Sequence, residues 1–297
     1  MPGGFHREEE RKGEAMIRFG GPLFGVDMLD PDAVAEACRR LGYGAIYCPD
    51  LDPDDERGCR DYGEAIRRRG LMIAEAGVWV RLAGPDPGET EKNLQKAIGR
   101  MRVAELVGAQ CCVDIAGSFH PGSWHGADPR NVSGEMFEAA VENARRIIDA
   151  VKPRRAKFTY EMMQWAIPDS PDSYLELIRA VDREAFGVHL DPTNIINCPR
   201  RFYDTGAVIR ECFEKLGPYI VACHAKDVAM EPERAIVHLS ETRIGTGNLD
   251  YATYLRCLDA LRRDVPLMME HLRTPQDYAL AAQEVRRVAR EVGVELA

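Results

Sequence analysis

Short apolar segments alternate with longer amphipathic segments along most of the chain. Strands in globular proteins are short and apolar, whereas helices are longer and repeat their apolar positions every three to four residues. We predict strands at Ile17–Gly20, Ala45–Cys48, Leu71–Glu75, Gln110–Ile115, Lys157–Glu161, Gly187–Asp191, Ile220–His224 and Leu267–Glu270. We predict helices at Asp32–Leu41, Arg57–Arg69, Thr90–Val107, Ser133–Val151, Ser173–Val181, Asp204–Leu216, Asp250–Arg263 and Pro275–Val292.

The residues at the predicted helix ends support these boundaries. A capping side chain followed by proline is typical of a helix start, and such pairs occur at Asp30-Pro31, Ser170-Pro171 and Thr274-Pro275. Glycine just after a helix is typical of a left-handed cap. We predict such caps at Gly42, Gly70, Gly108 and Gly217, each a few residues before a strand.

Eight strand–helix pairs with short turns predict a single (β/α)₈ barrel of the α/β class. The length of 297 residues fits this fold, which typically takes about 250 residues. A doubly wound open sheet is disfavoured because no GxGxxG follows an early strand. We expect residues 1–15 to be a disordered tail and residues 16–297 to form the barrel, with Met16 a candidate for the natural start. Long loops are expected at Gly117–Val132 and Val228–Leu249.

Four ionisable residues end four successive predicted strands: Glu161, Asp191, His224 and Glu270. The carboxyl ends of parallel strands meet at one mouth of a barrel, so these side chains should lie close together. Buried carboxylates are costly unless they are paired or bind a cation. Taken singly, Asp191 is typical of a turn cap and His224 of a core histidine. The ordered set of four favours one divalent ion, because three carboxylates and one imidazole suit Mn²⁺, Mg²⁺ or Co²⁺.

The motifs around these residues (YE161, HLD191P, H224AKD and ME270H) resemble the xylose-isomerase-like barrel superfamily. This superfamily of sugar phosphate isomerases and epimerases includes ketose 3-epimerases, hydroxypyruvate isomerase and inosose dehydratase. The resemblance spans roughly residues 17–290. It implies a metal site made by Glu161, Asp191, His224 and Glu270, with manganese first and magnesium, cobalt or zinc as alternatives. In the epimerases the two glutamates flank the substrate carbon and exchange its proton.

Two features depart from the ketose 3-epimerase pattern. Asn194 stands three residues after Asp191, where those enzymes tend to carry a histidine. Their arginine a few residues beyond the metal histidine is missing, because HAKD continues into Val228 and Ala229. The resemblance therefore defines the superfamily and leaves the reaction open. We assign Asn194 as a candidate substrate contact.

Strand alternation predicts which neighbouring side chains share the mouth. Lys226 shares a face with His224, so it either polarises a substrate oxygen or pairs with Asp227 or Glu270. His189 shares a face with Asp191 one layer deeper, which suits a residue that holds a ligand. We assign Lys226 as catalytic with Glu161 and Glu270.

Further candidates for substrate binding come from loops and strand ends. Glu75 is either a sugar contact or a structural ion-pair partner, and Trp79 can stack on a sugar. His120, with Trp124 and His125 in GSFHPGSWHG, fits a lid. Arg243, beside the turn Gly245–Asn248 that leads to Asp250, is a further candidate contact. His271 follows Glu270 and should point outward, so it is excluded.

Composition narrows the function classes. The net charge of −9 and the pI near 5.4 weigh against nucleic-acid binding. Nine cysteines without a CxxC pair suggest reduced thiols and a cytoplasmic protein. No apolar stretch reaches the roughly 18 residues of a membrane span, and no signal peptide is evident. The sequence leaves room for a homo-oligomer.

These observations predict a metal-dependent sugar or polyol isomerase or epimerase that abstracts a proton beside a carbonyl through a metal-stabilised enediolate. A lyase or dehydratase acting on a keto-sugar, keto-glycoside or inosose would use the same residues. A non-catalytic sugar- or metal-binding subunit is the third alternative. A DNA-repair endonuclease of the superfamily is rejected, because its trinuclear zinc site needs more histidines at the strand ends than this chain has.

Overall fold

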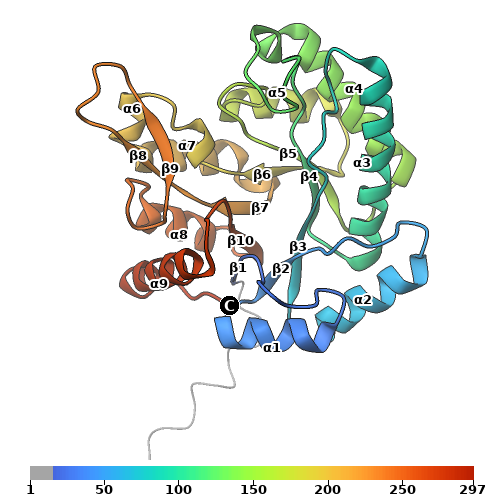
Figure 1. Cartoon of the computed structure of the whole chain (residues 1–297), viewed down its shortest axis with the longest axis horizontal. Helices are drawn as coiled ribbons and strands as arrows, with labels where there is room; N and C mark the ends of the chain where they lie inside the picture. Colours follow the sequence, from blue (N-terminus) through green and yellow to red (C-terminus); the bar gives the residue numbers. More distant parts are fainter. Residues whose placement is uncertain (1–15) are drawn as a thin grey trace, which may run out of the picture.

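A closed ring of eight parallel strands forms the centre of the molecule, with helices around it (Figure 1). The computed structural model describes residues 16–297. In ring order the strands are β1 (Ile17–Gly20), β10 (Val265–Met269), β7 (Ile220–Ala225), β6 (Phe186–Leu190), β5 (Lys157–Glu161), β4 (Cys111–Asp114), β3 (Met72–Gly77) and β2 (Ala45–Tyr47). The predicted (β/α)₈ barrel is confirmed. The tail predicted for residues 1–15 lies outside the described residues.

The helices follow the strands in the predicted order. They are α1 (Pro31–Leu41), α2 (Glu56–Arg68), α3 (Pro87–Val107), α4 (Gly134–Val151), α5 (Pro171–Val181), α7 (Thr205–Leu216), α8 (Tyr251–Ala260) and α9 (Pro275–Val292). A short helix, α6 (Pro199–Phe202), precedes α7, and 3₁₀ turns lie at Pro129–Val132, Thr193–Ile195 and Gly217–Tyr219. The side chains of Asp30, Ser170 and Thr274 accept backbone N–H groups, which confirms the three predicted starts.

One of the four predicted left-handed glycines is wrong. Gly42, Gly70 and Gly108 have φ between 65° and 77°, as a left-handed cap requires. Gly217 instead has φ −43° and ψ −46°, and it opens the 3₁₀ turn Gly217–Tyr219. The residue before a proline is disfavoured in the helical region, partly because its Cβ meets the proline ring. Glycine before Pro218 removes the Cβ contact, which explains its place there.

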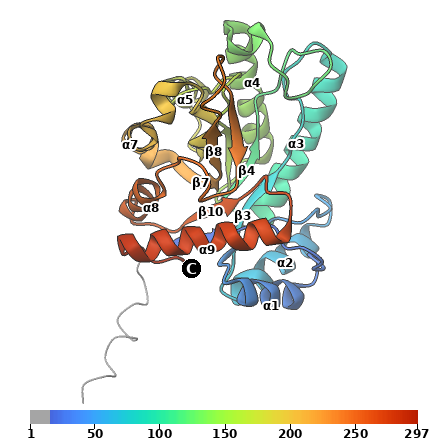
Figure 2. The same cartoon turned by 60° about the vertical axis from the view of Figure 1, so that its left-hand side comes forward.

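A two-stranded hairpin occupies the region predicted as the loop Val228–Leu249. Strands β8 (Asp227–Met230) and β9 (Leu239–Thr242) pair antiparallel, with Asp227 opposite Thr242. The hairpin projects from the ring of strands and is drawn in orange (Figures 1 and 2). Its base is fixed because Asp227 accepts backbone N–H groups of Val228, Gly245, Gly247 and Leu249. The hairpin therefore stands at the mouth of the barrel.

Close packing at the seam between β1 and β2 closes the ring. A Cβ at Gly20 would lie 2.2 Å from the carbonyl oxygen of Ala45, so only glycine allows this approach. Because all eight strands are parallel, their carboxyl ends open on one face. None of the helices within residues 16–297 combines the length and apolar composition that a membrane crossing needs.

Candidate metal centre and the cavity above it

The structure brings the four predicted metal ligands together at the carboxyl ends of the strands. Glu161 ends β5, Asp191 follows β6, His224 lies in β7, and Glu270 follows β10. One ligand atom from each lies within 4.8 Å of the others. His224 Nδ1 is 2.9 Å from Glu270 Oε1, 3.1 Å from Glu161 Oε1 and 3.9 Å from Asp191 Oδ2. All four are wholly or largely buried.

The ammonium group of Lys226 lies among the same carboxylates. Its Nζ is 2.6 Å from Glu270 Oε1, 2.9 Å from Asp191 Oδ2 and 3.5 Å from Glu161 Oε1. Of the pairings predicted for Lys226, the structure shows the one with Glu270. Asp227 is occupied by backbone N–H groups instead. A buried lysine thus partly balances the charge of this cluster.

The cluster controls the ionisation of its members. Burial raises the pKa of Glu161, but the charges of Lys226 and His224 outweigh it and lower the pKa to about 2. Burial also opposes the ionisation of Glu270, yet His224 and Lys226 hold its pKa well below the ordinary value. For Asp191 burial prevails and raises the pKa. Burial lowers the pKa of His224, but Glu270, Glu75 and Glu161 together raise it well above the ordinary value.

The arrangement fits a hard divalent cation. Asp191 Oδ2 is buried without a hydrogen bond and forms an ion pair with Lys226 Nζ. Glu270 Oε1 lies close to two cationic groups, Lys226 Nζ and His224 Nδ1. Buried carboxylate oxygens in this state are suited to a cation. Three carboxylates and one imidazole provide oxygen-rich ligands of the kind that Mn²⁺ and Mg²⁺ prefer.

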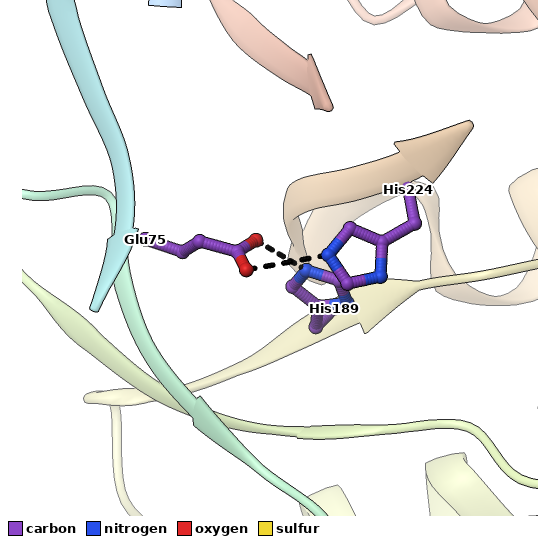
Figure 3. Close-up of side chains that lie close together, drawn as sticks. All are labelled: Glu75, His189 and His224. Atoms are coloured by element: carbon purple, nitrogen blue, oxygen red, sulfur yellow. Dashed lines mark hydrogen bonds and ion pairs between the residues drawn. The ribbon is translucent and has the colours of Figure 1, made fainter. Parts of the chain in front are cut away.

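A second layer lies beneath the cluster, where Glu75 of β3 reaches two histidines (Figure 3). Glu75 Oε2 is 2.7 Å from His189 Nε2, and Oε1 is 3.2 Å from His224 Nε2. Burial would raise the pKa of Glu75, but His224 and His189 lower it to about 2. Of the two roles predicted for Glu75, the structure shows the ion-pair partner. His189 lies one layer deeper, as predicted, and holds Glu75.

A cavity of about 310 Å³ lies directly above the cluster. Glu161 and Glu270 contribute to its wall, together with Ile115 and Met163. The aromatic side chains Trp79, Trp124 and His125 also line it, as predicted for stacking and lid residues, and His271 completes the lining. The volume is within the range of small-molecule sites.

The prediction that His271 points outward is wrong. Strand β10 ends at Met269, so the alternation of side chains stops before this position. His271 has φ 59°, which turns it back toward the mouth. Its Nδ1 lies 3.0 Å from Glu241 Oε2 and 3.5 Å from Lys226 Nζ. Glu241, from hairpin strand β9, is a mouth residue that the prediction of a loop at Val228–Leu249 does not reveal.

Trp79 is the one predicted substrate contact that lines this cavity. Glu75 and His189 lie in the layer beneath it, and the remaining three lie elsewhere. Arg243 lines a separate surface hollow beside α9, because the hairpin carries it past the mouth. His120 bends into its own loop, where its Nδ1 accepts the N–H of Gly122. Asn194 is buried, and its Nδ2 donates to Glu161 Oε1 at 3.1 Å. Asn194 therefore positions Glu161 in this structure.

The closed barrel and the acidic centre at its mouth define a (β/α)₈ protein with a candidate metal site. A profile of the xylose isomerase-like TIM barrel family matches residues 35–292, and the chain belongs to this family. The predicted superfamily is therefore confirmed. No curated protein matches the sequence significantly.

Solved structures of low sequence identity share the fold. A xylose isomerase-like TIM barrel protein from Mycobacterium smegmatis in complex with magnesium is 20% identical, with a TM-score of 0.63 and 89% of each chain covered. Endonuclease IV from Thermus thermophilus is 17% identical, with a TM-score of 0.66 and coverage of 92% of this chain and 99% of that chain. D-Psicose 3-epimerase from Clostridium cellulolyticum, solved with D-tagatose, is 13% identical, with a TM-score of 0.64 and coverage of 94% and 97%.

Proposed function

We propose that this protein is a divalent-metal-dependent isomerase or epimerase of a sugar, with manganese as the first candidate metal. The observation that carries the proposal is the position of two glutamates. Glu161 and Glu270 both belong to the four-residue cluster and both line the cavity above it. A sugar in that cavity would meet two carboxylates and the candidate metal at once.

The order of the strands supports a two-base arrangement. β5 and β10, which carry the two glutamates, are separated in the ring by β6 and β7. Glu161 and Glu270 therefore reach the cavity from two sides of Asp191 and His224. One carboxylate takes the proton from the carbon beside the carbonyl, and the electron pair moves onto the carbonyl oxygen. A water molecule, or the second glutamate once it is protonated, then returns a proton to the second carbon or to the other face of the first.

A divalent ion held by Glu161, Asp191, His224 and Glu270 would supply polarisation of the carbonyl and balance the negative charge on oxygen. Lys226 and Asn194 would keep Glu161 ionised and oriented, because both contact its Oε1. Glu75 would hold His224 through Nε2, so that Nδ1 faces the other three ligands.

The epimerase and the magnesium complex among the structural neighbours are consistent with this proposal. An endonuclease also shares the fold. Against that function stand the net charge of −9 and the single imidazole in the four-residue cluster. The tryptophans that line the cavity suit a sugar better than a phosphodiester backbone, which requires clustered cations.

The test is proton exchange. Protein loaded with Mn²⁺ is incubated in D₂O with a panel of ketoses and 3-keto sugars, and deuterium uptake and product are followed by NMR. We expect uptake at one carbon of one panel member. Glu270→Gln should reduce exchange by about 100-fold or more while the circular dichroism spectrum stays unchanged.

The matched control is Glu176→Gln, an exposed position on α5, which should exchange at the wild-type rate. No uptake with any sugar would count against the proposal. Uptake accompanied by loss of a β-substituent would replace the isomerase with a lyase. A fully active Glu270→Gln protein would remove Glu270 from the proton transfer.

A further inference from the structure

A second and larger hollow lies beside the cavity above the cluster. Its volume is about 670 Å³, against about 310 Å³ for the cavity. It is formed by the segments that follow β2 and β3 and by one face of α3. Trp79 lines both spaces and is the residue that they share. The two spaces are therefore neighbours at the mouth of the barrel.

The backbone at Trp79, the residue shared by the two spaces, is unusual. Trp79 has φ 55°, a left-handed conformation that bulky residues rarely adopt. Such strain persists where the surrounding structure holds it, often at binding sites. Gly77 makes the ring position possible, because a Cβ there would lie 2.1 Å from Trp79 Nε1. The ring centre is 6.5 Å from that of His224, and the residue stays 36% exposed.

The larger hollow is lined by two carboxylates, and neither is free inside it: the oxygens of Glu75 contact His189 and His224, and Asp50 is exposed. The rest of the lining suits an uncharged, apolar group. Leu51, Pro53, Val80 and Val103 contribute apolar surface. Arg100 also lines the hollow, but its guanidinium donates to the backbone oxygens of three residues, Cys48, Pro49 and Gly77. Lys96, the other cation in the lining, is exposed at the rim. This set does not provide the cluster of free cations that a phosphate requires.

The size of the two spaces argues for an extended ligand. A monosaccharide in the cavity above the cluster would leave the larger apolar hollow filled only with water. Apolar surface next to a binding site favours a ligand that covers it. A ring joined to the sugar would pass the edge of Trp79 and pack against its other side.

We propose that the substrate is a keto-glycoside, with its keto-sugar ring in the cavity above the cluster and an apolar aglycone in the larger hollow against Trp79. This assignment rests on the proposed function, because it takes the sugar to bind at the four-residue cluster. It names a substrate class that the cluster alone does not define.

The experiment compares matched ligands on the Mn²⁺-loaded protein. Methyl and phenyl β-D-glucosides, β-D-galactosides and β-D-xylosides that carry a 3-keto group are titrated by calorimetry, with cellobiose carrying the same keto group as a second-sugar probe. We expect the phenyl member of at least one pair to bind about tenfold or more tightly than the methyl member, because the phenyl ring becomes buried. Equal affinity within every pair that binds would overturn the aglycone assignment and leave the proposed function standing.

Two variants test whether the tighter binding of the phenyl members arises in the larger hollow. Gly99 of α3 lines the hollow, and a Cβ there meets Pro53 at an ordinary 3.4 Å. Gly99→Leu should therefore fill the space and bring the ratio of phenyl to methyl affinity close to one. Lys96→Trp, from an exposed rim position, should do the same if Gly99→Leu does not fold. The matched control is Gly134→Leu in α4, where a Cβ has no neighbour within 4 Å.

The remaining outcomes are also decisive. A ratio unchanged in both filling variants would overturn the assignment of the hollow. A gain with cellobiose and none with the phenyl glycosides would replace the apolar aglycone with a second sugar and overturn it as well. Absence of binding by every glycoside, together with deuterium exchange of a free ketose, would overturn the glycoside and keep the proposed function. Absence of glycoside binding together with absence of deuterium exchange would overturn the substrate assignment and the proposed function alike.

Discussion

Lys226 and a divalent ion would compete for the same oxygens at the mouth of the barrel. Lys226 Nζ contacts Glu270, Asp191 and Glu161, three members of the candidate ligand set. Its other neighbours at 3.4–3.6 Å are Asn194 Oδ1, His271 Nδ1 and Glu241 Oε1. These groups offer the ammonium a place beside the cluster when a cation takes the carboxylates. Lys226 thus stabilises the metal-free protein and must yield to the ion.

Replacing Lys226 separates these two effects. Lys226→Met leaves buried carboxylates without their cation, so we expect the metal-free protein to lose about 3 kcal/mol of unfolding free energy. Saturating Mn²⁺ should recover most of that loss. Urea denaturation with chelator measures the loss of unfolding free energy, and urea denaturation with Mn²⁺ measures its recovery. The control is Lys215→Met, an ion-paired lysine on the surface of α7. Metal-free Lys226→Met protein as stable as the wild type would contradict this account.

Asp114 at the end of β4 gives a pH-dependent prediction away from the cluster. Its Oδ1 accepts the N–H groups of Val80 and Ile115, while Oδ2 is buried without a hydrogen bond. Burial raises the pKa of this carboxyl well above its ordinary value. The unfolded chain releases the proton near pH 4, whereas the folded protein retains it to higher pH. Asp114 therefore costs stability as the pH rises above about 4.

The variant Asp114→Asn has no such titration. The difference in unfolding free energy, Asn protein minus wild type, should increase from pH 4 upward by about 1.4 kcal/mol per pH unit until the folded carboxyl ionises. Urea denaturation at pH 4, 5, 6 and 7 measures this slope. The slope is the readout, because the asparagine amide also changes a hydrogen bond. A constant difference over this range would show that the buried carboxyl ionises normally.

At the scale of elements, the sequence predicts those features that depend on neighbouring residues, such as helix starts and strand ends. The starts of α1, α5 and α9 follow from Asp30, Ser170 and Thr274, because a cap and a proline act within one turn. The ligand set follows for the same reason, since each strand end is a local feature and parallel strands bring the ends together. Hairpin β8–β9 was missed. Its second strand, Leu239–Thr242, is half-exposed to exposed and has no continuous apolar run.

The roles of individual site residues depend on contacts that no local rule gives. The hydrogen bonds of Glu75 with His189 and His224 join residues 114 and 149 positions apart. His271 enters the mouth because a left-handed residue follows β10, and sequence alternation does not report that turn. The larger hollow forms between α3 and two loops, so its lining is a property of tertiary packing. The sequence predicts Trp79 as a stacking residue, but it does not predict the larger hollow that Trp79 also lines.

At the scale of the whole molecule, the candidate site joins distant parts of the barrel. Its ligands come from β5, β6, β7 and β10, and their support comes from β3. The unfolded chain separates these residues by up to 109 positions, from Glu161 to Glu270. An ion bound by all four would therefore bind the native barrel far more tightly than the unfolded chain. The protein also carries a net charge of −9, so cation binding at the mouth reduces repulsion.

Metal binding should consequently stabilise the entire barrel. At an Mn²⁺ concentration 100 times the dissociation constant, the native state gains about 2.7 kcal/mol. For a chain of this size that corresponds to a rise in Tm of roughly 4 to 5 °C over chelator-treated protein. Scanning calorimetry over a series of Mn²⁺ concentrations measures the shift, which should follow the logarithm of concentration. Asp191→Asn should lose most of it, whereas Asp172→Asn on the surface of α5 should keep it. A Tm independent of Mn²⁺, or a shift retained in Asp191→Asn, would place any bound ion elsewhere.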